Sequence, residues 1–176
     1  MTKLASIITR LEERNPLPPL CPKDVWNAGL SKEIQSLSTT DISQTGNVSQ
    51  LSLQAVKSGL LLWNDDLYSS HTISQSITND LGSYWHGIMH RREGDFSNAK
   101  YWFAQVGNYP TFQPLYEQAS KISPLIKKWG EWKPNKFIDE VSYVVKNGLE
   151  DTPEGIELRQ IEVLETSLLI QYSVTV

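Results

Sequence analysis

The sequence predicts an all-α fold, a single-domain irregular helical bundle that spans residues 1–176. Apolar residues recur at steps of three and four along most of the chain, which is the spacing of a buried helix face. Prolines, glycines and asparagines interrupt this pattern at short intervals, so we expect about seven to nine helices. Valine and isoleucine near several segment ends leave a small strand contribution open.

The N-terminal portion, residues 1–47, is expected to pack around the central part of the chain. Residues 2–14 carry leucine and isoleucine at helical spacing and end before a proline-rich connector, because proline disfavours further helix. The segment 25–37 predicts one or two short helices. Residues 38–47 are rich in Ser, Thr, Gln and Gly and predict a loop.

The central part, residues 48–107, has the strongest helical pattern. A long helix is predicted from its start, and its apolar side continues past Tyr68. Capping oxygens in the segment 78–80 precede a second helix over 81–93. A Gly-Asp turn then leads into a third helix, which ends at Gly107, and the second and third helices form a hairpin.

The helix predicted over 81–93 has two different faces. One face is bulky and apolar: Leu81, Tyr84, Trp85, Ile88 and Met89. The other face has small or histidine side chains: Ser83, His86, Gly87 and His90. A helix of this kind is expected to pack on both sides, which places the histidines in a seam between helices.

The C-terminal portion, residues 111–176, is again helical in outline. The pattern predicts a helix over 112–122, another that stops at Asn147-Gly148, and a last one that starts at Pro153. A connector near residues 127–136 carries two tryptophans among four lysines. We expect these tryptophans to anchor the connector to the core.

Composition excludes several classes of protein. The single cysteine, Cys21, cannot form an internal disulfide, which fits a reducing compartment and a cytoplasmic location. No apolar run approaches the roughly 20 residues that span a bilayer, so membrane insertion is not expected. Sixteen basic against twenty acidic residues disfavour a broad nucleic-acid surface.

The predicted hairpin resembles a tetratricopeptide repeat. The matching residues are Gly87, Gly94, Asp95, Phe96, Ala99 and Phe103. The resemblance covers about one repeat, and it implies a tetratricopeptide-like hairpin in which Gly87 lies opposite Ala99. It does not imply a repeat array, which needs about three units to bury its faces.

The segment 86–103 reads His-Gly-Ile-Met-His-Arg-Arg-Glu-Gly-Asp-Phe-Ser-Asn-Ala-Lys-Tyr-Trp-Phe. This string is similar to a motif of a group of uncharacterised bacterial and fungal helical proteins. The resemblance implies an all-helical fold and no particular activity.

The three histidines of the chain are its clearest candidates for metal binding. His86 and His90 are four residues apart and project from one helix face, the spacing that offers two imidazoles to one ion. His71, Asp66 or Asp65 could supply a further ligand if their helix packs antiparallel, so a divalent transition metal is the cofactor that this set would hold. The competing interpretation is that the histidines fill the helix seam and pair with polar neighbours.

Arg91 and Arg92 lie beside these histidines, and their planar guanidinium groups are suited to binding an anion, although the two side chains point to different sides of the helix. The competing interpretation is structural, through ion pairs with Asp65, Asp66, Glu93 or Asp95 or through the helix dipole. The residues that we expect to contact a ligand are Asp66, His71, Trp85, Arg91 and Arg92.

The sequence identifies no catalytic residue and no substrate. We expect a non-enzymatic binding or scaffold module with a groove near residues 63–103, whose partner is a protein or a small anionic ligand. The alternative is a metal-dependent or histidine-based enzyme with its site at His71, His86 and His90.

Overall fold

The computed structural model describes residues 2–43 and 47–176, and these ranges contain eleven helices and no strand. The all-α fold class is therefore confirmed, and the strand contribution that the sequence left open is not found in these ranges. The helices are α1 (Lys3–Glu12), α2 (Ala28–Gln35), α3 (Thr39–Ile42), α4 (Gln50–Trp63), α5 (Leu67–Ser74), α6 (Asp80–Glu93), α7 (Phe96–Val106), α8 (Phe112–Ile122), α9 (Pro124–Lys127), α10 (Pro134–Lys146) and α11 (Pro153–Ser173).

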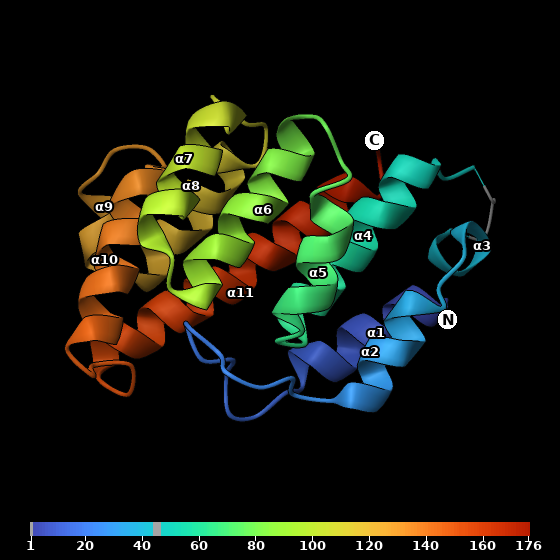
Figure 1. Ribbon diagram of the computed structural model, residues 1–176. Helices are drawn as coiled ribbons and strands as arrows, with labels where there is room; N and C mark the ends of the chain where they lie inside the picture. The colour runs from blue at the N-terminus through green and yellow to red at the C-terminus, as the bar shows by residue number, and fades with distance from the viewer. Residues whose placement is uncertain (1, 44–46) are drawn as a thin grey trace.

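The helices follow one another across the molecule (Figure 1). Helices α1 to α3 lie at one end, α4 to α7 in the middle and α8 to α10 at the other end. The longest helix, α11, passes behind the middle group and packs against α4, α8 and α10. One hydrophobic cluster of buried side chains runs through all these groups.

The long helix predicted through Tyr68 is interrupted, which corrects that prediction. Helix α4 ends at Trp63, and Asp65 adopts a left-handed backbone conformation with φ of 63°. The side chain of Asp66 then accepts a hydrogen bond from the backbone N–H of Ser69 and caps α5. The break therefore follows from local polar groups that compete with a continuous helix.

The predicted hairpin corresponds to α6 and α7. The side chain of Asn79 caps α6 by accepting from the N–H of Gly82, and Asp95 caps α7 in the same way at Asn98. A Cβ atom on Gly87 would lie 2.8 Å from the ring of Phe103, so the close approach at this glycine involves that ring.

Two four-residue helices differ from the prediction. Helix α3 forms inside the segment expected to be a loop because Ser38 and Asp41 make a reciprocal capping box. The rest of that predicted loop includes residues 44–46, which lie outside the described ranges. Helix α9 was not predicted and ends at Lys127, the first residue of the predicted connector, with Pro124 at its first turn and Ser123 as its cap.

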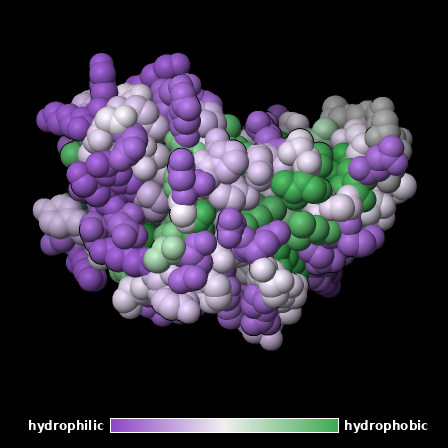
Figure 2. Space-filling view, turned by 90° about the horizontal axis from the view of Figure 1, so that it is seen from above, coloured by the Kyte–Doolittle hydropathy of each residue, from purple (hydrophilic) through white to green (hydrophobic). Residues whose placement is uncertain are grey.

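The face of the molecule drawn in Figure 2 is mostly polar. Seen from above, hydrophobic residues gather on the side that carries the grey atoms. Over the described residues, no helix has the length and apolar character needed to cross a membrane.

Candidate metal centre

The three histidines meet between helices α5 and α6. The Nε2 atoms of His71 and His86 lie 2.9 Å apart. Each of the three histidines offers a ring nitrogen, and these three atoms all lie within 4.8 Å of one another. The i, i+4 spacing of His86 and His90 on α6 and the packing of α5 against α6 produce this convergence.

His86 sits in the middle of the cluster. Its ring stacks on Trp102 of α7, with centroids 4.0 Å apart, and on the ring of His90, with centroids 4.7 Å apart. Only 6% of His86 is exposed. Burial, together with the neighbouring His90 and His71, lowers the pKa of His86 to about 4. The ring is therefore neutral near pH 7, the state in which imidazole binds a metal ion.

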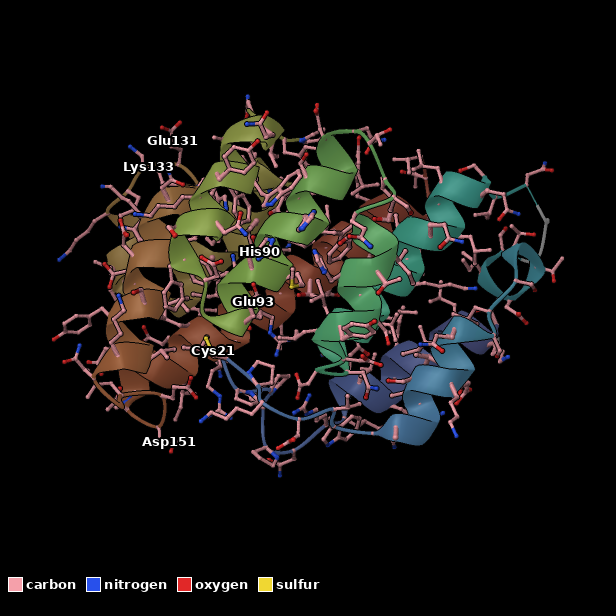
Figure 3. All side chains as sticks on the ribbon, viewed as in Figure 1. Cys21, His90, Glu93, Glu131, Lys133 and Asp151 are labelled. Atoms are coloured by element: carbon pink, nitrogen blue, oxygen red, sulfur yellow. The ribbon has the colours of Figure 1, made fainter. Side chains whose placement is uncertain are left out.

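A carboxylate orients His90. Its Nδ1 atom lies 2.7 Å from Oε1 of Glu93, one helical turn further along α6 (Figure 3). An Nδ1–H that donates to Glu93 leaves Nε2 as the atom with a free lone pair, an arrangement common around metal-bound histidines. The side-chain nitrogen of Asn98 lies 3.2 Å from that Nε2 and competes for it.

Asp66 is not part of the three-histidine group within the described ranges. One of its side-chain oxygens is engaged in capping α5, as described above. Asp66 therefore positions the helix that carries His71, and Asp65 pairs with Arg14 and Arg92 instead. The structure brings together the three predicted histidine ligands.

A second group, His90, Glu93 and Asp95, also has the spacing of a metal site. Both carboxylates are exposed, and a side-chain oxygen of Asp95 caps α7. The three side chains are close together because they lie on one turn between α6 and α7, and no bound ion is needed to explain their positions.

Arg91 and Arg92 are buried, which corrects their assignment as ligand-binding residues. Arg91 lies 2.5 Å from Glu165 of α11, and Arg92 lies 2.7 Å from Asp65. Both arginines also contact Glu162. The expected ion pair with Asp65 is thus confirmed for Arg92, whereas Arg91 pairs with acids that were not expected.

Other residues extend this buried ionic network. Arg14 approaches Asp65 to 2.5 Å, and the hydroxyl of Tyr84 donates to Glu165 at 3.0 Å. Three arginines thus face three carboxylates, and none of these charges is free to bind an external anion. Burial raises the pKa of Glu162, against the lowering effect of Arg92 and Arg91.

Sequence reasoning missed Glu162 and Glu165. Both lie on α11 and interrupt its apolar stripe, so the sequence pattern predicts that they are exposed to solvent. The available signal was their i, i+3 spacing, which puts two acids on one helix side.

Trp85 is also buried and is not available to an external ligand, which corrects that prediction. A Cβ atom on Gly59 of α4 would lie only 2.5 Å from the Trp85 ring. The indole therefore fills the contact between α4 and α6.

Two surface grooves adjoin the cluster. One, of about 350 Å³, is lined in part by Asp66, His71 and Glu93. The other, of about 370 Å³, is lined in part by His86 and Trp102. Both lie near the predicted region 63–103. The carboxylates of the first groove disfavour a small anionic ligand there.

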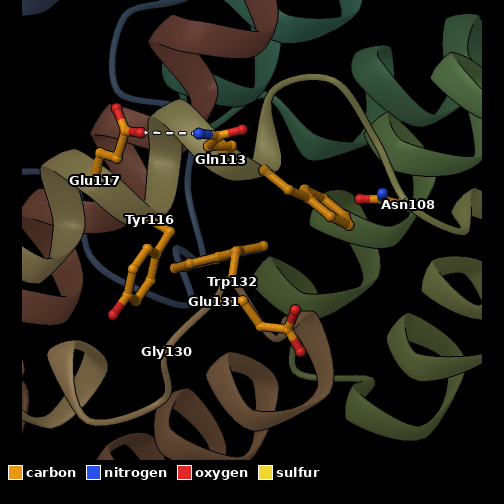
Figure 4. Close-up of a pocket in the computed structure, with 8 residues that line it drawn as sticks. Asn108, Gln113, Tyr116, Glu117, Gly130, Glu131 and Trp132 are labelled. Atoms are coloured by element: carbon orange, nitrogen blue, oxygen red, sulfur yellow. Dashed lines mark hydrogen bonds between the residues drawn. The ribbon is translucent and has the colours of Figure 1, made fainter.

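One of the two tryptophans of the lysine-rich connector, Trp132, lines a third groove, which we call the Trp132 groove (Figure 4). Trp132 is buried and packs on Phe137 with centroids 5.0 Å apart. Its expected role as a core anchor is therefore confirmed. Glu117 and Glu131 line this groove, so it does not present a basic surface for nucleic acid.

Comparison of the chain with family models, with curated proteins and with solved structures finds no match. The geometry of the site is accordingly the basis for any functional assignment.

Proposed function

We propose that this chain binds a divalent transition metal ion through His71, His86 and His90. The observation that carries the proposal is the convergence of three imidazole nitrogens from two helices within 4.8 Å. Zinc–nitrogen bonds of about 2.0–2.1 Å place two ligand nitrogens about 2.9–3.4 Å apart for bond angles between 90° and 109°. The 2.9 Å separation of the His71 and His86 nitrogens lies at the 90° end of this range, so the two rings would move apart by about 0.4 Å around a tetrahedral ion.

The surroundings of the cluster support metal binding over simple filling of a helix seam. The nearest polar partner of His86 is another imidazole. His90 has the carboxylate partner Glu93, which favours the tautomer that a metal ligand needs. An all-imidazole set suits zinc, copper, iron or nickel better than magnesium or calcium.

Three protein ligands leave a coordination position open on a four-coordinate ion. The half-buried His71 lines the first groove, so this position would be reached from the surface. A metal held there would polarise a bound water or carbonyl oxygen, which is the basis of the enzymatic alternative.

A second candidate function is a metal-free binding module that uses the same region. The observation that favours it is the pair of grooves beside the cluster, one of which includes the highly exposed ring of Tyr68. In that case His71 and His86 would share a hydrogen bond, with one ring donating and the other accepting.

Metal analysis of untagged protein distinguishes these functions. We expect about one zinc or other transition-metal ion per chain, lost in His71→Ala and in His90→Ala. His71 is the most exposed of the three, so His71→Ala should keep the helical circular-dichroism signal. Gln75→Ala, at the surface in the other groove, is the matched control.

Two results would overturn the metal proposal. One is metal-free wild-type protein that shows no saturable binding of Zn²⁺ by calorimetry. The other is Zn²⁺ binding of equal affinity in wild type and His71→Ala, which would place the ion elsewhere.

A further inference from the structure

A groove of about 320 Å³ lies between helices α9, α10 and α11, and we call it the α10–α11 groove. It shares no lining residue with the two grooves beside the histidines. Its floor is apolar and includes Val144 and Leu158, which are buried, and Leu149, which is half-buried.

Two large apolar side chains stand at the mouth of this groove. Leu125 is 42% exposed and Tyr143 is 60% exposed. The mouth therefore offers apolar area to an incoming group.

The rim of the α10–α11 groove is acidic. Glu140, Glu154 and Glu157 line it, and no lysine or arginine does. Within the described ranges, none of the three forms an ion pair or a side-chain hydrogen bond. Glu154 has a structural reason to be there, because an acid favours a helix N-terminus, but Glu140 lies in the middle of α10.

We propose that the α10–α11 groove binds an amphipathic helix of a partner protein, with apolar residues on one side and lysines or arginines beside them. Apolar side chains of such a helix would enter between Leu125 and Leu158. Its basic side chains would pair with the three rim glutamates, which attract positive charge in this arrangement. A second copy of this chain fits less well because each copy carries a net charge of −4.

The probe for this proposal is a fluorescent synthetic peptide of about 14 residues, with leucine and lysine at helical spacing. We expect saturable binding by fluorescence anisotropy at low salt, and affinity at least about tenfold lower at 0.5 M salt because the charges are screened. A peptide with glutamate in place of lysine should not bind. Absence of saturable binding by the lysine peptide overturns the proposal.

Paired charge reversals locate the site. Glu140→Lys with Glu157→Lys should weaken binding at least about tenfold. Glu117→Lys with Glu131→Lys, at the Trp132 groove, changes the net charge equally and should alter affinity less than about threefold. Equal losses in both double variants would mean general attraction to an acidic protein and would overturn the proposal.

Two further measurements complete the test. Leu125→Ala with Tyr143→Ser removes apolar groups that are 42% and 60% exposed, so we expect the fold to persist. The peptide binding that remains at high salt should be lost. Sedimentation of the chain alone checks for a second copy as the occupant. A dimer that Glu140→Lys with Glu157→Lys dissociates would overturn the proposal.

Discussion

The guanidinium of Arg92 lies 2.7 Å from the carboxylate of Asp65, and both side chains are buried. This ion pair joins the C-terminal end of α6, which carries His86 and His90, to the turn that begins α5, which carries His71. The three-histidine cluster therefore depends on a contact that lies beneath it.

Removal of the Asp65 charge should destabilise the protein strongly. In Asp65→Asn, the buried Arg14 and Arg92 lose their shared partner, and we expect the free energy of unfolding to fall by about 3–5 kcal/mol. Asn tolerates the left-handed backbone at this position, so the loss of stability measures the effect of removing the charge and not of backbone strain. Urea denaturation monitored by circular dichroism measures it.

The matched control for this prediction is Asp139→Asn, which breaks the exposed pair between Lys100 and Asp139. Its cost should stay below about 1 kcal/mol. Equal effects of the two substitutions would show that the buried network does not hold the helices together.

Loss of the Glu93 carboxylate should weaken the proposed metal site without unfolding the protein. In Glu93→Ala, His90 loses the partner of its Nδ1 atom, and Zn²⁺ affinity should fall about 10–100-fold. The Glu93 side chain is 42% exposed, so the melting temperature should change little. Calorimetric titration with Zn²⁺ measures the effect, and unchanged affinity would exclude an orienting role for Glu93.

A methyl group at Gly59 should disrupt the contact between α4, α6 and α11. The added Cβ would lie 2.5 Å from the Trp85 ring and 2.7 Å from Ile170. Gly59→Ala should therefore cost about 1–3 kcal/mol by overpacking, although alanine ordinarily favours a helix. Gly29→Ala is the control, because its Cβ would meet only one side-chain atom, at 3.3 Å. Greater stability in Gly59→Ala would contradict the packing described here.

The thiol of Cys21 should react slowly at neutral pH. Burial, aided by Glu162 and Glu150, raises its pKa to about 12 from an ordinary value of 9.0. Since only the thiolate reacts, the native protein should react with a disulfide reagent about a thousandfold more slowly than the unfolded protein at pH 8.

Ionisation of the Cys21 thiol should also make the free energy of unfolding depend on pH in the alkaline range. Because the folded pKa is raised, the unfolded chain loses its proton first, so the contribution to stability is present below pH 9.0 and declines as the pH rises towards 12. Cys21→Ser, with a hydroxyl that does not ionise in this range, is the control. Rapid labelling of the native protein at pH 8 would contradict the burial of Cys21.

The hairpin of α6 and α7 was predictable because its signals are local. Asn79 and Asp95 lie directly before the helices that they cap, and the spacing of His86 and His90 already places them on one face. The position of His71 was left open, since it depends on the break at Asp65, where short polar side chains outweigh the apolar pattern.

The buried ionic network was largely hidden from the sequence. Arg91, Arg92, Glu162 and Glu165 look like solvent-exposed residues until their helices are packed together. An analysis of apolar spacing assigns every charged residue to the surface, because it does not consider whether the charge has a partner inside the protein. Of the acids that pair with the arginines, only Asp65 was among the expected partners.

The buried ionic network also bears on how fast the chain folds. It joins residues near positions 14, 65, 92 and 162, which are far apart in sequence. A charge that reaches the interior before its partner loses its water without compensation, so the network must close in a late step that needs nearly the whole chain. The same contacts break early when the protein unfolds, and the unfolding rate should respond to Asp65→Asn more than the folding rate does.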